Sequence, residues 1–133
     1  EKYPLWASWR EEVIATSRCQ GSLRTPYGRR VHVPANSAAT AGPARLAQST
    51  ARDIFMDGVL RMDELGLTKH LRLMLHDEVL MSVPIREYEQ FAARTIECLS
   101  TTWTPPGLKF AVPIEASAAL PGSTWADCYR GEK

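Results

Sequence analysis

Residues 71–84, LRLMLHDEVLMSVP, limit the possible folds more than any other stretch of the chain. Apolar side chains alternate with other residues on both sides of a short polar centre, which is typical of two strands joined by a tight turn. That centre holds His76, Asp77 and Glu78. The pattern therefore predicts a β-hairpin with an imidazole and two carboxylates at its tip.

Other segments carry helical or strand-like patterns. Apolar residues recur at steps of three and four in three segments, which predicts helices at residues 4–19, 44–65 and 84–103. Turn residues and short β-type runs predict a first hairpin at 22–33, a loop at 34–43 and a last strand within 108–118. The order helix, hairpin, helix, hairpin, helix, strand is an α+β pattern, with helices packed on a small antiparallel sheet.

The periodicity also predicts which helical side chains are buried. In the first helix, Leu5, Trp9 and Val13 fall on one side, and Ile85 begins the apolar side of the third helix. In the helix at 44–65 the apolar side is expected to run from Ala47 to Met62.

Length and composition exclude several classes of protein. The chain has 133 residues, about one domain in size, and no apolar run near the roughly 18 residues of a membrane helix. Its three cysteines are far apart in the sequence and fit neither a zinc spacing nor a disulfide framework, so reduced thiols in a cytoplasmic protein are expected.

Charge is distributed unevenly although the net charge is only +1. Residues 13–52 contain arginines and no acid, whereas acids dominate residues 53–89. A basic half suits a polyanion and an acidic cluster suits a divalent cation, although either set of charges can simply solvate a surface.

A polar stripe lies opposite the apolar side of the helix at 44–65. Arg45, Gln48 and Arg52 recur at steps of three and four, so they project from one side. Guanidinium groups can neutralise phosphates, and an amide can hydrogen-bond the minor-groove acceptors that all base pairs share. The stripe is either a nucleic-acid surface or an ordinary solvated side of a helix.

The acidic tip of the predicted hairpin suits Mg²⁺, which prefers oxygen ligands. Two neighbouring carboxylates do not complete a two-metal centre, so an acid from another segment must approach Asp77. The remaining histidines, His32 and His70, have no metal-type spacing to His76.

The hairpin sequence resembles motif C of the family A DNA polymerases, in which apolar strands flank His-Asp-Glu. AQSTARDIF at 47–55 resembles the family's QGTAADI helix, and TPYGRR at 25–30 resembles the GRR hairpin before it. YP at 3–4 and WAD at 125–127 match two weaker landmarks near the ends of the chain. Ser49 stands where the family usually has glycine, and Arg52 where it usually has alanine.

The resemblance implies roles for individual residues. Asp77 would bind catalytic Mg²⁺, Glu78 would support the metal site, and His76 would lie near the primer terminus. Gln48 would touch the minor groove of the newest base pair. The arginines expected to contact DNA are Arg29, Arg30, Arg45 and Arg52.

The resemblance further implies that the chain is the C-terminal part of a polymerase domain. Residues 1–50 would be the end of the fingers with the hairpin that leads to the palm, and residues 51–133 the palm segment with motif C. A second metal-binding aspartate would lie in an N-terminal remainder, without which the chain is expected to be inactive. The expected partners are that remainder, primer–template DNA and deoxynucleoside triphosphates, in a bacterial or phage-infected cytoplasm and with no membrane.

Two alternatives belong to other classes. The first is a catalytically silent nucleic-acid-binding module on the same scaffold, against which the retained carboxylates argue, since they are costly where they are not used. The second is an unrelated metal-dependent hydrolase, which would need further His or Asp ligands.

Overall fold

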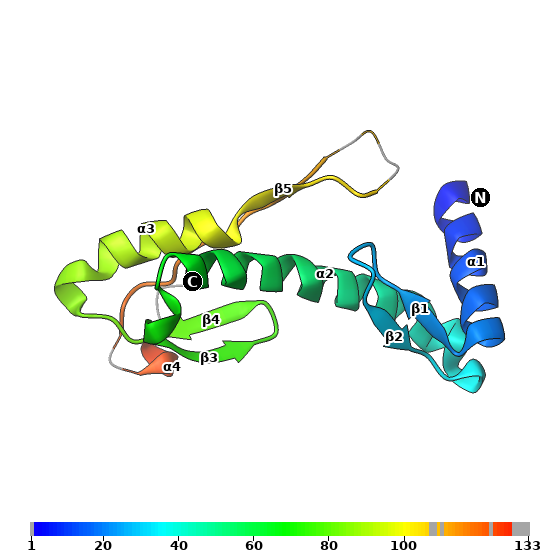
Figure 1. Ribbon diagram of the computed structural model, residues 1–133, viewed down its shortest axis with the longest axis horizontal. Helices are drawn as coiled ribbons and strands as arrows, with labels where there is room; N and C mark the ends of the chain where they lie inside the picture. The colour runs from blue at the N-terminus through cyan, green and yellow to red at the C-terminus, as the bar shows by residue number, and fades with distance from the viewer. Residues whose placement is uncertain (1, 107–108, 110, 123, 129–133) are drawn as a thin grey trace. The chain divides into compact units, whose positions relative to one another are not determined.

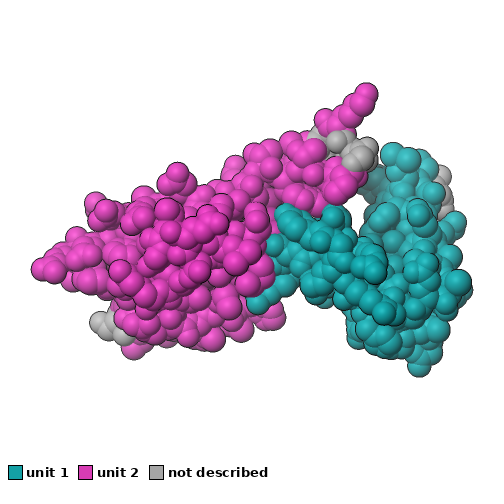
Figure 2. Space-filling model, viewed as in Figure 1, with its two compact units in different colours: residues 1–53 teal, residues 54–133 magenta. Residues whose placement is uncertain are grey.

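A computed structural model describes residues 2–106, 109, 111–122 and 124–128 of the chain. Helices and short antiparallel strands alternate along it, which confirms the predicted α+β class (Figure 1). The chain divides into two compact units, residues 1–53 and residues 54–133, which are coloured separately in Figure 2.

In the first unit, helix α1 (Pro4–Gln20) begins and ends as the sequence predicts. Pro4 occupies the first turn, where its missing N–H is not needed. Gly21 ends the helix with a φ of +64°, and its N–H donates to the Ser17 carbonyl at 2.9 Å. Glycine adopts this left-handed conformation without the steric penalty of a side chain.

The predicted buried side of α1 is only partly correct. Val13, Ile14 and Ser17 are buried, but Leu5 is 87% exposed and Trp9 is 38% exposed. Helix α1 packs against strand β1 (Ser22–Arg24) and the short helix η1 (Ala35–Ser37). Periodicity identified an apolar side, but burial also requires a neighbouring element, and the buried residues lie in the C-terminal half of α1.

The first hairpin pairs β1 with β2 (Arg30–His32) in antiparallel register, with Leu23 opposite Val31. The Gly28 N–H donates to the Thr25 carbonyl at 2.8 Å, which closes the predicted turn. Val13, Leu23 and Val33 form the apolar core of this unit, against which Val31 and Leu46 also pack. This hairpin is therefore held by its own apolar side on the helices of the first unit.

The predicted loop at 34–43 is wrong, because helix α2 (Ala38–Glu64) begins at residue 38 and contains Pro43. Proline removes the hydrogen bond that the Ala39 carbonyl would otherwise accept within the helix. Arg10 supplies a donor instead, with its Nη2 3.4 Å from the Ala39 oxygen. The small residues here allow close packing, since a Cβ added to Gly42 would lie 3.0 Å from Ser17 Oγ. The composition that suggested a loop is thus explained by contact with α1.

The second unit contains the C-terminal part of α2, which ends where predicted. Gly66 follows the helix with a φ of +67°, and the Leu67 N–H donates back to the Met62 carbonyl at 2.9 Å. Met62, Leu67 and Cys98 form the buried core of this unit, with Val79 and Met81 packed against it. Of the apolar side predicted for α2, Ala47 and Ala51 are exposed, whereas Ile54, Val59 and Met62 are buried.

Helix α3 (Tyr88–Leu99) approaches α2 closely at Gly58. A Cβ at this position would lie 3.0 Å from the Cys98 carbonyl oxygen and 3.1 Å from the Leu99 Cα. Arg61 Nε donates to the same Cys98 carbonyl at 2.9 Å, which gives the end of α3 a hydrogen-bond partner from α2. Glycine is favoured at position 58, because a Cβ there would need backbone atoms of α3 to shift, and these move less easily than a flexible side chain.

The predicted central hairpin is confirmed. It consists of β3 (Leu71–Leu75) and β4 (Glu78–Met81), and its antiparallel register shifts between Leu71 and Leu73. The short helix η2 (Thr68–His70) leads into it from α2, and η3 (Ile85–Glu87) leads from it towards α3.

The third predicted helix is too long at both ends. Ile85 is 73% exposed in η3, and α3 stops at Leu99 because Ser100 is extended, with a ψ of 138°. Residues Thr101–Trp103 form β5, which pairs with β6 (Val112–Ile114) so that Thr102 lies opposite Pro113. The β-branched and aromatic residues of β5 favour a strand once a partner strand is present.

The described strands form three separate two-stranded antiparallel sheets, and helix α4 (Trp125–Cys128) follows the last of them. Among the described residues, no helix has the length and apolar character needed to cross a membrane.

Truncating Met62 to alanine is expected to destabilise the fold by about 2–5 kcal/mol, because this fully buried side chain would leave a cavity. Leu60→Ala, two residues away on α2 and 60% exposed, is the matched control and should change stability by less than about 0.5 kcal/mol. Urea unfolding followed by circular dichroism measures both. Equal losses for the two variants would contradict the assignment of the core.

Candidate nucleic-acid and metal site

The tip of the β3–β4 hairpin is a two-residue turn. Leu75 pairs with Glu78, so His76 and Asp77 form the turn and Glu78 is the first residue of β4. His76 has a φ of +54°, the only positive φ of a non-glycine residue that the structure describes. Both favoured two-residue hairpin turns need a positive φ at their first position. An L-residue there costs about 1–2 kcal/mol relative to glycine, so the imidazole is retained at the expense of local stability.

The carboxylates at this tip are accessible from solvent. His76, Asp77 and Glu78 are all exposed, at the tip of a hairpin that packs on the core through Val79 and Met81 of β4. Their oxygens have the chemistry that Mg²⁺ requires. Within the described residues, however, no three His, Cys, Asp or Glu side chains are grouped so that they could hold a metal ion. The hairpin can therefore contribute ligands to a metal site but needs more from elsewhere.

The other described histidines take part in local contacts. His70 Nδ1 lies 3.1 Å from the Ser82 carbonyl oxygen, and its ring meets Phe91 edge-on at a centroid distance of 4.6 Å. His32 lies in β2, and its carbonyl oxygen accepts a hydrogen bond. The His70 ring therefore has a role in the structure of its unit, whereas His32 contributes through its backbone carbonyl.

Cys98 is unsuited to nucleophilic chemistry. It is 4% exposed, and burial raises the pKa of its thiol above the usual range, although the nearby Arg61 charge acts in the opposite direction. A thiol that stays protonated is a poor nucleophile and metal ligand. Cys98 therefore belongs to the core.

The predicted stripe lies on the part of α2 that belongs to the first unit. Arg45, Gln48 and Arg52 are exposed, as the helical spacing predicts. Arg45 also contributes to the fold, since its Nη1 donates to the His32 carbonyl at 2.9 Å. A guanidinium has five N–H donors, so one such bond leaves others for a ligand.

The two arginines of the first hairpin are also bonded within the unit. Arg30 Nε donates to Ser22 Oγ at 3.0 Å. Arg29 makes an ion pair with Asp53, with 2.6 Å between Nε and Oδ1, and its Nη2 donates to the Ser49 carbonyl at 2.8 Å. The Arg29 side chain thus contacts α2 at Ser49 and Asp53, which follow Gln48 in the sequence.

Sequence analysis did not identify Asp53 as part of this site. Asp53 lies four residues after Ser49, so both face the same side of α2. The available signal was that Asp53 is the first acid after the acid-free segment 13–52. That signal does not reveal the partner, because Arg29 is 24 residues away.

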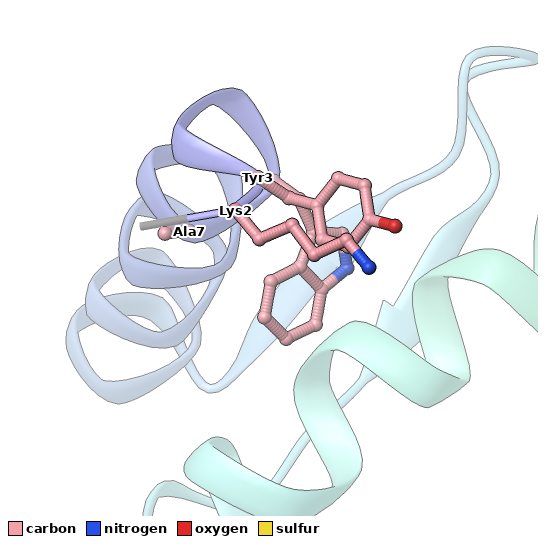
Figure 3. A pocket seen from close by; sticks show the side chains of 4 residues that line it. Lys2, Tyr3 and Ala7 are labelled. Carbon is pink, nitrogen blue, oxygen red and sulfur yellow. The ribbon is translucent and has the colours of Figure 1, made fainter.

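A shallow hollow lies near the start of the described chain (Figure 3). It is lined by Lys2, Tyr3, Trp6 and Ala7, and the Lys2 ammonium lies 5.6 Å from the centre of the Tyr3 ring. None of the predicted site residues lines it, so the hollow offers no alternative site for the predicted chemistry.

Comparison with known proteins identifies relatives along nearly the whole chain. The chain is 28% identical to a thermostable DNA polymerase I of Thermus thermophilus over 94% of its length, and 25% identical to a DNA polymerase I of Lactococcus lactis over the same share. It is 32% identical to a DNA polymerase of Mycobacterium phage D29 over 71% of its length. No family model and no solved structure matches the chain.

The matched region is a small part of each relative. The chain spans 16% of the Thermus protein, 15% of the Lactococcus protein and 15% of the phage protein. All three are named as DNA polymerases, and two as DNA polymerase I. By sequence the chain is thus related to the family A-like DNA polymerases, both the bacterial DNA polymerase I proteins and the phage enzymes.

Proposed function

We propose that the chain is the C-terminal, palm-containing part of a template-directed DNA polymerase. The observation that carries the proposal is the exposed His76-Asp77-Glu78 tip of a hairpin anchored on a core, in a chain similar to DNA polymerases over 94% of its length. Residues 1–50 would end the fingers and lead into the palm, and residues 51–133 would form the palm segment.

In this proposal Asp77 is the metal-binding carboxylate of the chain, and Glu78 supports it. Mg²⁺, when bound, would stabilise the charge that develops on the transferred phosphate and lower the cost of ionising the primer 3′ oxygen. Asp77 would hold its place because the turn is short and the strands behind it are hydrogen-bonded. His76, directly before it, would lie against the primer terminus.

A further aspartate from the remainder of the polymerase would complete the metal site. The described residues lack a complete ligand group, and the hairpin has accessible apolar side chains, with Leu73, Met74 and Leu75 each 37–40% exposed. Such side chains are more stable against another apolar surface than in water. Activity is therefore assigned to an assembly of this chain with that remainder.

The exposed side of α2 would bind the primer–template duplex. Gln48 would hydrogen-bond minor-groove acceptors that every correct base pair presents in similar positions. Phosphates would be bound by the charge and the remaining donors of Arg30, Arg45 and Arg52. Arg29 directly precedes Arg30 in the hairpin. Such contacts sense the geometry of a base pair without reading its sequence.

Asp77→Ala is expected to reduce primer extension by orders of magnitude, because it removes a carboxylate that would hold the metal ions. DNA binding should be retained. The measurement is single-turnover extension of a primer–template by the polymerase assembly, with Glu89→Ala, an exposed acid at the start of α3, as the control. A catalytically silent binding module would show no extension by the parent protein, and near-normal extension by Asp77→Ala would exclude the metal role.

Gln48→Ala should slow extension from matched primer ends more than from mismatched ends. A mismatch displaces the minor-groove acceptors, so the parent glutamine assists only the matched substrate. An unsatisfied hydrogen-bonding group costs about 1–3 kcal/mol, which corresponds to about a fivefold or larger change in rate. Single-turnover extension from both primers measures the ratio. Equal slowing of both would assign Gln48 to an ordinary solvated side of α2.

His76→Gly should separate stability from activity at the hairpin tip. Glycine adopts the positive φ freely, so the free energy of unfolding should stay equal or rise by about 1 kcal/mol. Primer extension should nevertheless fall, because the imidazole is lost. Urea unfolding and extension are compared for this variant and for His76→Asn, which tolerates the same φ. Parallel loss of stability and activity in His76→Gly would contradict this assignment.

A further inference from the structure

We propose that Arg29 is a positioning residue: it holds the turn of α2 that carries Gln48 and thereby sets the contact of that glutamine with the base pair. This inference rests on the proposed function. It gives Arg29 a role different from the direct phosphate contact that the sequence suggested.

The geometry joins one guanidinium to two points of α2. Arg29 Nε is 2.6 Å from Asp53 Oδ1, and its Nη2 is 2.8 Å from the Ser49 carbonyl oxygen. Ser49 directly follows Gln48, so the second bond is made to the Ser49–Thr50 peptide group, one residue beyond the glutamine. Two bonds from a planar guanidinium fix direction as well as distance.

The other end of this link is also held in place. The Arg29 N–H donates to Thr25 Oγ1 at 3.2 Å, and its carbonyl accepts from the Thr25 N–H at 2.9 Å. Thr25 is only 4% exposed. The backbone of Arg29 is therefore fixed at the end of the hairpin, and the side chain transmits that position to α2.

A second contact reaches α2 on the other side of Gln48. Arg45, three residues before the glutamine, donates from Nη1 to the His32 carbonyl at 2.9 Å. The hairpin consequently bonds to α2 both before and after Gln48, while Gln48 itself remains exposed. This arrangement fixes the backbone of α2 at Gln48. It leaves the amide group at the end of the side chain available to a ligand.

Burial and charge distinguish this pair from a phosphate contact. The Asp53 side chain is 11% exposed and the Arg29 side chain 47% exposed. The Asp53 charge lies next to the guanidinium and offsets its attraction for a phosphate. Asp53 Oδ2 is buried and accepts no hydrogen bond from the part of the chain that the structure describes, so the carboxylate depends on Arg29 for its compensation.

The test compares Arg29→Ala, Asp53→Asn and the double variant in the polymerase assembly. The measured quantity is the ratio of the single-turnover extension rates from matched and mismatched primers. This ratio should fall by the same factor in all three variants, about fivefold or more. When Gln48 is already replaced by alanine, adding Arg29→Ala should lower this ratio no further. Arg24→Ala is the matched control, because the Arg24 side chain donates to the Gly28 carbonyl within the same hairpin and makes no hydrogen bond to the described residues of α2. It should leave discrimination unchanged.

The salt dependence of DNA binding separates positioning from direct contact. A positioning residue predicts the same salt slope for Asp53→Asn, Arg29→Ala and the parent. A phosphate contact predicts a slope smaller by about one in Arg29→Ala only, with discrimination unchanged. That result would overturn the proposal, as would additive effects of Arg29→Ala and Gln48→Ala.

Hydrogen exchange at the amides of residues 45–53 provides a measurement that does not depend on activity. Exchange should become faster in both Arg29→Ala and Asp53→Asn than in the parent. Unchanged exchange in both single variants would overturn the positioning role. A parent assembly that extends no primer, but shows this exchange pattern, would refute the proposed function while leaving the link between hairpin and helix established.

Discussion

Helix α2 must remain continuous through a proline, and much of the structure depends on that constraint. The helix contributes Leu46 to one apolar cluster and Met62 to the other, and it carries Gln48 between them. Pro43 leaves the Ala39 carbonyl without its helical donor, and Arg10 provides a replacement from α1. Gly42 allows α1 to come close enough for this bond. An arginine on one helix thus compensates for a proline on another.

Much of the fold could be predicted from local patterns, and the errors share a physical cause. Both hairpins, the left-handed glycines at helix ends and the last strand follow from turn residues and periodicity. The segment 34–43 was assigned to a loop because its small residues and proline are typical of loops. They serve close packing instead, which depends on a partner far away in the sequence. Periodicity likewise predicts a helix at residues 101–103. These residues form a strand because they pair with β6, a partner that their local sequence does not indicate.

The residues of the candidate site also fall into two groups: those that local patterns predict and those that they do not. The exposed tip at His76 and Asp77 and the exposed stripe at Gln48 follow from alternation and helical spacing. The ion pair of Arg29 with Asp53 does not, because nothing in either local segment identifies the other. Sequence patterns identified the residues that face solvent, whereas the residues that hold them in place required the structure. The similarity to DNA polymerases then supplies a chemical context for both sets.

The burial of Cys98 makes this thiol an indicator of opening in the second unit. It belongs to the same buried cluster as Met62 and Leu67, and its raised pKa keeps it protonated while the core is closed. A thiol reagent can therefore modify it only when the end of α3 separates from α2, whereas exposed Cys19 can react in the closed state. The rate of its modification would follow local opening of this core, independently of the chemistry at the hairpin tip.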